Sequence, residues 1–237
     1  MKYSLSQSCR WISIGRCSQK LPAVCLALAL FGAITRPVEA QLGSRPAEAW
    51  IKTLESSHRV TGLKIDETIT KLDIKPGDRI ADIGAGSGLY CPPLARAVSP
   101  GGRVYAVDIE PGLIDHIANR ARELDLTNIV TVLGQFTDPN LPVHNLDLAC
   151  MFDVLHHIEH RAEYLRNLVH YLKPTGRIAV VDFHPERGPH RDDPALQITK
   201  DQTDDWMASI GFKPMSEFEL FDDKWFVVYA RSPIPPP

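Results

Sequence analysis

The run DIGAGSG at residues 82–88 is the part of this 237-residue chain whose spacing most clearly indicates chemistry. It ends a short apolar segment, and a helical pattern begins directly after it. Glycines in such a turn let a ligand approach backbone N–H groups at the start of a helix. The dinucleotide fingerprint GxGxxG would require glycine at position 89, where the chain has Leu89, so the spacing is GxGxG. A glycine-rich connection without a ligand is the alternative.

Two adjacent histidines, His156 and His157, follow the apolar run LDLACMF at residues 146–152. An imidazole, with a pKa of about 6.5, can take a proton from a hydroxyl or amine nucleophile. We therefore consider His157, ahead of His156, as a catalytic base, and a role in shaping a pocket is the alternative. We expect no metal, because the two histidines have no third ligand at a suitable spacing and the chain has no CxxC motif.

The elements that must position these residues are short apolar runs that alternate with amphipathic stretches. We expect strands at 79–84, 103–108, 128–133, 146–152 and 176–183, and helices at 46–57, 66–72, 89–98, 160–172, 200–210 and from residue 110. This alternation predicts a parallel sheet with helices on both faces. The last two runs, 213–220 and 224–231, are separated by three residues, which is too short for a parallel crossover. The sequence thus predicts an α/β, doubly wound, mostly parallel seven-stranded sheet with a C-terminal antiparallel hairpin.

A family resemblance follows from these motifs taken together. The stretch ADIGAGSG, with Asp108 at the end of the next strand, resembles the cofactor site of class I S-adenosylmethionine-dependent methyltransferases. The likeness covers about residues 74–231, because VLGQFTDPNLP, LDLACMFDVLHHI and YLKPTGRIAVVDF follow in the order of that family. The chain is most similar to the small-molecule branch that resembles quinone-biosynthesis methyltransferases. The resemblance implies a Rossmann-like fold, S-adenosylmethionine as cofactor, and methyl transfer to a small-molecule nucleophile by direct displacement.

The resemblance also implies how the cofactor is held. Asp82 and the Gly84–Gly88 turn would hold its methionine portion. Asp108 would accept hydrogen bonds from both ribose hydroxyls, a bidentate role that suits a carboxylate. Ile109 would pack on the adenine face, and residues 151–153 would lie beside the reacting sulfonium.

The segment after the third strand departs from the family pattern. The family usually has Gly-Asp there, with the acid reaching the adenine amino group, whereas this chain has Gly134 followed by Gln135. Gln135 or Asp138 would take that role. The full set of implied cofactor-binding residues is Asp82, Gly84, Gly86, Gly88, Asp108, Ile109, Gln135, Phe136 and Asp138.

Two other classes of function remain open. An NAD-dependent oxidoreductase would share the glycine turn and Asp108, but Leu89 replaces the glycine that it needs, and Tyr164 is not followed by lysine four residues later. A catalytically silent domain that binds a nucleoside-type ligand would keep only the cofactor half of the site.

The polar run HPERGPHRDDPALQIT at residues 184–199 follows the last parallel strand. Loops at the carboxyl ends of strands bind substrates in α/β enzymes. Its side chains His184, Arg187, His190 and Arg191 could meet an anionic or carbonyl-bearing substrate, and a solvated surface loop is the alternative. We expect a small-molecule substrate, no nucleic acid, and a monomer or weak homo-oligomer.

The first 40 residues differ from the rest in charge and hydropathy. They carry five basic residues against one acidic residue, so the net charge of −3 divides into +4 here and −7 in the remainder. A helix over the uncharged run 21–34 would span about 21 Å, less than a hydrocarbon core of about 30 Å. Small residues at Val38 and Ala40 predict a signal peptide cleaved after Ala40, hence export to the periplasm or medium. An uncleaved membrane anchor and an organellar transit peptide are the alternatives.

The expected organisation is a leader at 1–40, an N-terminal helical segment at 41–78, a methyltransferase domain at 79–231 and a Pro-rich tail at 232–237. After cleavage we expect no stable membrane insertion, and Cys91 and Cys150 are the cysteines that remain. A disulfide between them is conceivable outside the cytosol, but the apolar strand around Cys150 favours a buried free thiol. An exported enzyme would also leave the cytosolic cofactor pool, which keeps the catalytically silent alternative open.

Overall fold

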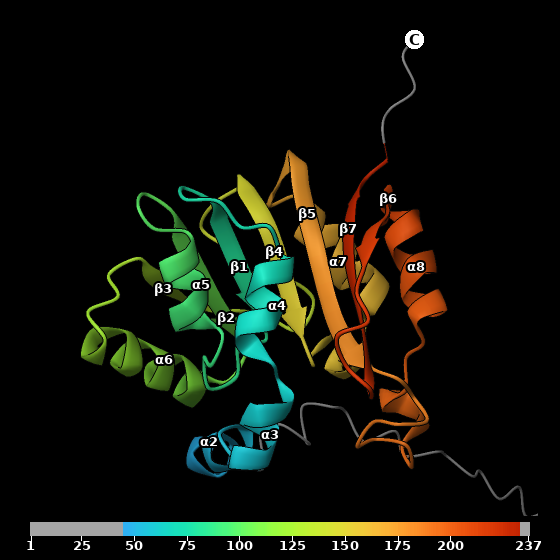
Figure 1. Ribbon diagram of the computed structural model, residues 1–237, viewed down its shortest axis with the longest axis horizontal. Coiled ribbons are helices and arrows are strands. Elements are labelled where there is room, and N and C mark those ends of the chain that lie inside the picture. The colour runs from blue at the N-terminus through green and yellow to red at the C-terminus, as the bar shows by residue number, and fades with distance from the viewer. Residues whose placement is uncertain (1–44, 233–237) are drawn as a thin grey trace, which may run out of the picture. The chain divides into compact units, whose positions relative to one another are not determined.

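Figure 1 shows the seven-stranded sheet of the computed structural model, which describes residues 45–232. The predicted leader at 1–40 and almost all of the predicted tail lie outside the described residues. The strands are β1 (Arg79–Ile83), β2 (Arg103–Asp108), β3 (Ile129–Leu133), β4 (Leu146–Phe152), β5 (Leu172–Phe183), β6 (Phe212–Glu217) and β7 (Lys224–Arg231). Their order in the sheet is β3-β2-β1-β4-β5-β7-β6.

The direction of the strands confirms the predicted fold class. Strands β1 to β5 are parallel to one another, whereas β7 is antiparallel to both β5 and β6. Strand β1 pairs with β2 on one side and with β4 on the other. The order in which the chain adds strands to the sheet therefore reverses between β1 and β4. In open α/β sheets, ligands bind outside the carboxyl ends of the strands at such a reversal. This edge of the sheet is therefore where the candidate site is expected.

Helices cover both faces of the sheet, and alternate residues of each strand pack against different helices. On one face Ile80 of β1 and Leu148 of β4 pack with Leu94 of α5 (Cys91–Ala97). On the other face Ala81 packs with Leu168 of α7 (Arg161–Val169). The remaining helices are α2 (Ala47–Leu54), α3 (Ser57–Gly62), α4 (Ile65–Lys71), α6 (Pro111–Glu123) and α8 (Lys200–Ser209) (Figure 1). Two short 3₁₀ helices, η1 (Leu155–His157) and η2 (Pro194–Leu196), lie in the loops after β4 and β5.

Two of the expected helices differ in extent from the structure. The helix predicted at 46–57 is present as α2 but ends at Leu54, because Ser56 is extended (φ −62°, ψ 139°), and a second helix, α3, begins at Ser57. The helix predicted at 160–172 ends at Val169, and Leu172 pairs with Leu146 of β4. The backbone N–H of Leu146 also donates to the carbonyl of Tyr171 at 3.0 Å. Pairing in the sheet thus replaces the last turn of that helix.

The cysteines and the hydropathy of the helices complete the description. Cys91 and Cys150 are both buried free thiols, as favoured for Cys150 from the sequence. Between residues 45 and 232, no helix is both long and apolar enough to cross a membrane.

Candidate functional site

The glycine turn after β1 is held in a conformation that glycine adopts readily. Gly84, Gly86 and Gly88 have φ values of +65°, +58° and +74°. A Cβ at Gly84 would lie 2.2 Å from Cγ2 of Val154, and a Cβ at Gly88 would lie 2.8 Å from Cγ1 of Ile117. Since side chains strongly disfavour positive φ, the turn needs glycine for its backbone and for its close contacts.

Asp108, at the end of β2, is tied directly to this turn. Its Oδ2 accepts a hydrogen bond from the N–H of Gly86 at 2.8 Å, and its Oδ1 accepts one from the N–H of Glu110 at 3.0 Å. A carboxylate has about four lone-pair sites, so each oxygen can still accept a hydroxyl. Burial raises the pKa of Asp108 above its ordinary value, and the hydrogen bonds from backbone N–H groups oppose that rise. The residues present therefore fit the ribose of a nucleoside cofactor.

Asp82, in β1 just before the turn, is buried. Its carboxylate faces α5, where Oδ2 accepts from the Cys91 thiol at 3.4 Å. Burial raises the pKa of Asp82 from 3.8 to about 7, with the charge of Asp108 adding to the effect. A buried, shifted acid in this position is typical of functional sites. Its contact with the methionine portion of a cofactor stays a prediction.

The segment after β3 is hydrogen-bonded through its backbone to the end of β2. The N–H of Gly134 donates to the carbonyl of Asp108 at 2.9 Å. Gln135 and Phe136 are exposed beyond it, and Ile109 is partly buried. Asp138 instead accepts the hydroxyl of Tyr171 on Oδ1 at 2.7 Å. This contact favours Gln135 over Asp138 for the predicted adenine contact.

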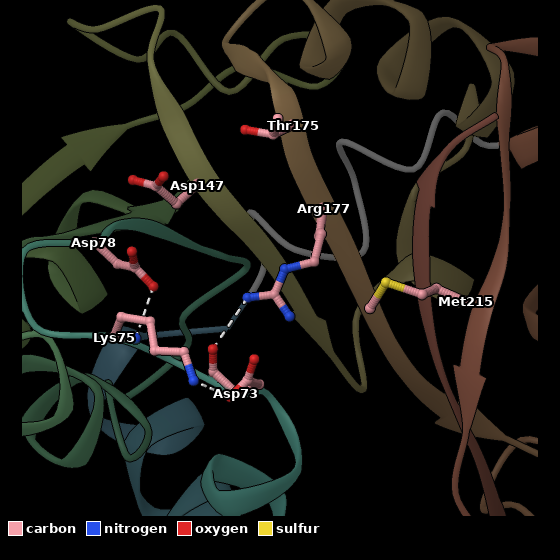
Figure 2. A pocket seen from close by; sticks show the side chains of 7 residues that line it. All are labelled: Asp73, Lys75, Asp78, Asp147, Thr175, Arg177 and Met215. Atoms are coloured by element: carbon pink, nitrogen blue, oxygen red, sulfur yellow. Dashed lines mark hydrogen bonds and ion pairs between the residues drawn. The ribbon is translucent and has the colours of Figure 1, made fainter. Parts of the chain in front are cut away.

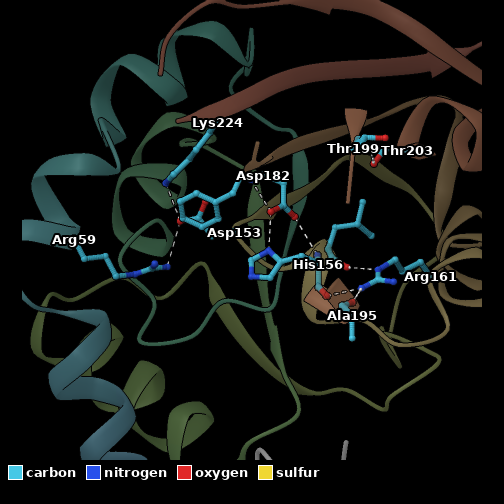
Figure 3. A network of polar contacts seen from close by, with 11 residues as sticks. Arg59, Asp153, His156, Arg161, Asp182, Ala195, Thr199, Thr203 and Lys224 are labelled. Carbon is cyan, nitrogen blue, oxygen red and sulfur yellow. Dashed lines mark hydrogen bonds and ion pairs between the residues drawn. The ribbon is translucent and has the colours of Figure 1, made fainter. Parts of the chain in front are cut away.

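His156 is the most constrained histidine of the site. It is 3% exposed, and its Nδ1 lies 2.6 Å from Oδ1 of Asp182 at the end of β5. The N–H of His156 also donates to Oδ2 of Asp182 at 3.1 Å. Asp182 is fully buried, so the pair fixes the imidazole ring beneath the surface of the site (Figure 3).

A third histidine joins the two found from the sequence. The rings of His157 and His190 lie 4.0 and 5.0 Å, centroid to centroid, from that of His156. The structure thus brings a third imidazole beside this pair, which the spacing in the sequence does not predict, and the expectation of no metal stays a prediction. The physical cause of this proximity is the fold: β4 and β5 are adjacent, so the loops that follow them meet, although their histidines are far apart in the chain. His190 is expected from the sequence only as a residue of a substrate-binding loop, and no short-range spacing could have revealed that it lies beside His156 and His157.

The basicity of His157 bears on its predicted role as a base. Desolvation and the neighbouring His156 and His190 lower the pKa of His157 well below its ordinary value, although solvent reaches part of the residue. A neutral imidazole with a low pKa takes up a proton poorly at pH 7. The low pKa favours a role for His157 as a hydrogen-bond acceptor or ligand. Its role as general base stays a prediction.

Asp153 adds an ion-pair network that sequence reasoning missed. Its Oδ2 lies 2.9 Å from Nζ of Lys224 on β7 and 3.4 Å from Nη2 of Arg59 on α3 (Figure 3). Asp153 has a positive φ of 54°, and the side chains of Asp153 and Lys224 are almost completely buried. The network therefore joins the N-terminal helical segment and the C-terminal hairpin at the end of β4.

A cavity of about 270 Å³ lies elsewhere, at the opposite edge of the sheet (Figure 2). Its lining residues are Asp73, Lys75, Asp78, Asp147, Thr175, Arg177 and Met215. Asp78 precedes β1 and Asp147 is the second residue of β4, so this cavity is at the amino ends of the parallel strands. It is separate from the site formed by the glycine turn and the histidines.

Known proteins share both the sequence pattern and the fold. Residues 81–178 match the family model of a methyltransferase domain. The chain is 29% identical over 125 residues to the ubiquinone/menaquinone biosynthesis C-methyltransferase of Ectopseudomonas mendocina, covering 52% of this chain and 48% of that protein. It is 32% identical over 116 residues to the 2-phytyl-1,4-naphtoquinone methyltransferase of Synechococcus elongatus, covering 48% and 50%. The chain spans about half the length, or less, of the curated relatives it matches.

Among solved structures, a SAM-dependent methyltransferase from Aquifex aeolicus superposes with a TM-score of 0.72. The alignment covers 79% of this chain and 100% of the other, at 20% identity. At this identity the likeness shows a shared fold, and function must be argued from the site.

Proposed function

We propose that this chain, which carries a methyltransferase domain on the class I fold, transfers a methyl group from S-adenosylmethionine to a small-molecule nucleophile. The family resemblance inferred from the sequence is confirmed by the matched domain and the methyltransferase relatives. The observation that carries the proposal is the hydrogen bond from Gly86 N–H to Asp108 Oδ2 at 2.8 Å. It fixes the glycine turn beside a carboxylate whose remaining lone pairs can bind two hydroxyls.

Methyl transfer requires the protein mainly to align the acceptor with the methyl group of the cofactor. When bound, the cofactor supplies an activated methyl group together with its leaving group. Asp108 would bind the ribose hydroxyls, and the Gly84–Gly88 turn would leave room for the methionine portion. The loops after β4 and β5 would orient the acceptor for in-line attack. Positioning of this kind can contribute effective molarities of about 10⁵ M or more.

A small molecule is the proposed acceptor class. Two relatives are named for quinone substrates, so quinone-like aromatic rings are the first acceptors to screen. The excess negative charge of residues 41–237, at −7, disfavours nucleic acid, whose binding depends on basic residues that neutralise phosphates. We also propose a monomer or weak homo-oligomer, which light scattering after size exclusion would test.

The direct test is calorimetric titration of the folded protein with S-adenosylmethionine, S-adenosylhomocysteine and NAD, followed by a screen for methyl transfer to quinone, phenol, amine and thiol acceptors. Binding of both sulfur compounds and labelling of an acceptor supports the proposal. Binding without transfer to any acceptor supports a catalytically silent domain. Heat with NAD alone would indicate an oxidoreductase and overturn the proposal.

We propose in addition that the protein is exported through a leader cleaved after Ala40. Support comes from the basic residues ahead of the apolar run 21–34 and from the small residues before the cleavage point. N-terminal sequencing of the protein from its native host tests this, and a start at Gln41 is expected. An intact Met1 would contradict cleavage and favour an anchor.

A further inference from the structure

Three imidazole rings from two separate loops converge beside the glycine turn. His156 and His157 lie on η1 after β4, and His190 lies in the loop after β5. One ring nitrogen from each can be chosen so that all three lie within 4.8 Å of one another. We propose that these three histidines form a binding site for one divalent transition-metal ion of the Zn²⁺ type.

The strongest single observation is an unsatisfied atom on His156. Its Nε2 is buried and has no hydrogen-bond partner within residues 45–232. Burying a polar atom without a partner costs free energy, so such an atom in a native structure calls for a ligand or water. Since Nδ1 is bonded to Asp182, Nε2 is the nitrogen that remains for a ligand.

Asp182 supports this assignment through the arrangement around His156. Metal-binding histidines usually bond their other ring nitrogen to a carboxylate or carbonyl, which fixes the tautomer and the ring orientation. The 2.6 Å contact between His156 Nδ1 and Asp182 Oδ1 has this form. Asp182 also accepts the N–H groups of His156 and Phe183, so the carboxylate cannot rotate freely.

The loop that carries His190 is held against η1 by side-chain contacts. Arg161 Nη2 donates to the carbonyl of His156 at 2.6 Å and to that of Ala195 at 2.9 Å (Figure 3). Gln197 Nε2 donates to the carbonyl of Arg191 at 2.6 Å. These contacts place the loop of His190 before any ion arrives, which lowers the entropic cost of forming a site.

The donor set indicates the class of ion. Imidazole nitrogens suit Zn²⁺, Cu²⁺, Ni²⁺ and Fe²⁺, whereas Mg²⁺ and Ca²⁺ prefer oxygen ligands. Zn–N bonds are about 2.0–2.1 Å long, so the three rings must move closer by a small amount. His157 is exposed and His190 is half-buried, which leaves them free to adjust. Three protein ligands would leave a coordination position for an external oxygen.

The site lies at the acceptor side of the proposed active site. Val154, two residues before His156, packs against Gly84 of the glycine turn. Metal binding itself does not rest on the proposed methyl transfer, because it can be measured without cofactor. A failure of one proposal is thus distinguishable from a failure of the other.

The experiment is a titration of the metal-free full chain with Zn²⁺ alone, with metal content measured by mass spectrometry and with Co²⁺ as a spectroscopic probe. His190→Ala removes one ligand at a half-buried loop position, and His170→Ala, an exposed histidine that follows α7, is the matched control. Circular dichroism verifies that every protein is folded.

We expect one equivalent of Zn²⁺ to bind to the wild type and to His170→Ala. Affinity should fall by at least about 100-fold in His190→Ala, since loss of an outer-shell partner alone costs about 10–100-fold. Asp182→Asn should lower it by about 10–100-fold if the variant folds. Absence of stoichiometric binding by the folded wild type would overturn the proposal. Equal affinities of His190→Ala and His170→Ala would overturn it too.

Discussion

The two halves of the site are built in different ways, although both lie at the carboxyl edge of one sheet. The half formed by β1 and β2 consists of backbone N–H groups, a glycine turn and the carboxylate of Asp108. The half formed by β4 and β5 consists of ionic and imidazole clusters of side chains, centred on the buried Asp153 and His156. The first half depends on local chain geometry, and the second depends on long-range packing.

This difference teaches where each half is vulnerable. A turn built from backbone groups tolerates few side chains, because added atoms collide with neighbours such as Val154. In a cluster of buried charges, removing one charged side chain strongly lowers the stability of the fold, because its partner is left as an unpaired charge in a medium of low polarity. Substitutions in the glycine turn and in the buried charge cluster can therefore test separately how the two halves of the site are stabilised.

The largest effect is expected for Asp153→Ala in the acceptor half. Lys224, whose side chain is 5% exposed, would lose its nearest counter-charge, and breaking a buried pair costs about 3–5 kcal/mol. Urea unfolding measures the loss. Glu186→Ala is the control, because it removes an exposed ion pair with Arg187 that is worth about 0–1 kcal/mol. Similar small losses in both variants would show that the Asp153 network is not a buried charge cluster.

A pH-dependent effect of similar size is expected from Asp82 in the cofactor half. The folded state holds the pKa at about 7, whereas the ordinary value is 3.8, so between about pH 4 and 7 the folded protein binds more protons than the unfolded chain. Its stability must therefore fall as pH rises through this window, by up to about 4 kcal/mol at roughly 1.4 kcal/mol per pKa unit.

The variant Asp82→Asn isolates this contribution, since an amide does not titrate. Relative to the wild type, the variant should gain stability progressively from pH 4 to pH 7 and hold a constant advantage above that. Denaturant midpoints at several pH values measure the difference. Parallel stability curves for the two proteins would contradict a raised pKa at Asp82.

A loss of about 2–5 kcal/mol, whose lower limit is below that for Asp153→Ala, is expected for Gly84→Ala. The substitution adds the cost of positive φ, about 1–2 kcal/mol, to the cost of a collision with Val154, about 1–3 kcal/mol. Gly77→Ala is the matched control, because Gly77 has a φ of +92° but open space around it. Thermal unfolding should show a larger loss at position 84 than at 77. Equal losses would mean that backbone strain alone, and not close packing, requires glycine in the turn.

The contrast between the halves also explains what the sequence could predict. The glycine turn and Asp108 could be predicted because each is recognised from residues that are near in the chain. The fold class could be predicted because strands and helices alternate along the sequence. His190 reaches the site because β4 and β5 are neighbours in the sheet, and Lys224 reaches it because β5 and β7 are neighbours. Because they are far from His156 and Asp153 along the chain, no spacing rule could predict these contacts, although the sequence indicates His190 as part of a substrate-binding loop. The predicted end of α2 is three residues too late, although its apolar spacing stops at Leu54.

The central claim is that Asp108 and the glycine turn hold a nucleoside cofactor, and titration of S-adenosylmethionine into Asp108→Ala tests it most directly. Hydrogen bonds to a charged group are worth about 1.5–3 kcal/mol each, and about 1.4 kcal/mol is a tenfold change in affinity. Loss of two such bonds should weaken binding at least about 100-fold, while Asp115→Ala, an exposed acid on α6, should bind as the wild type does. Unchanged affinity in folded Asp108→Ala would contradict the account.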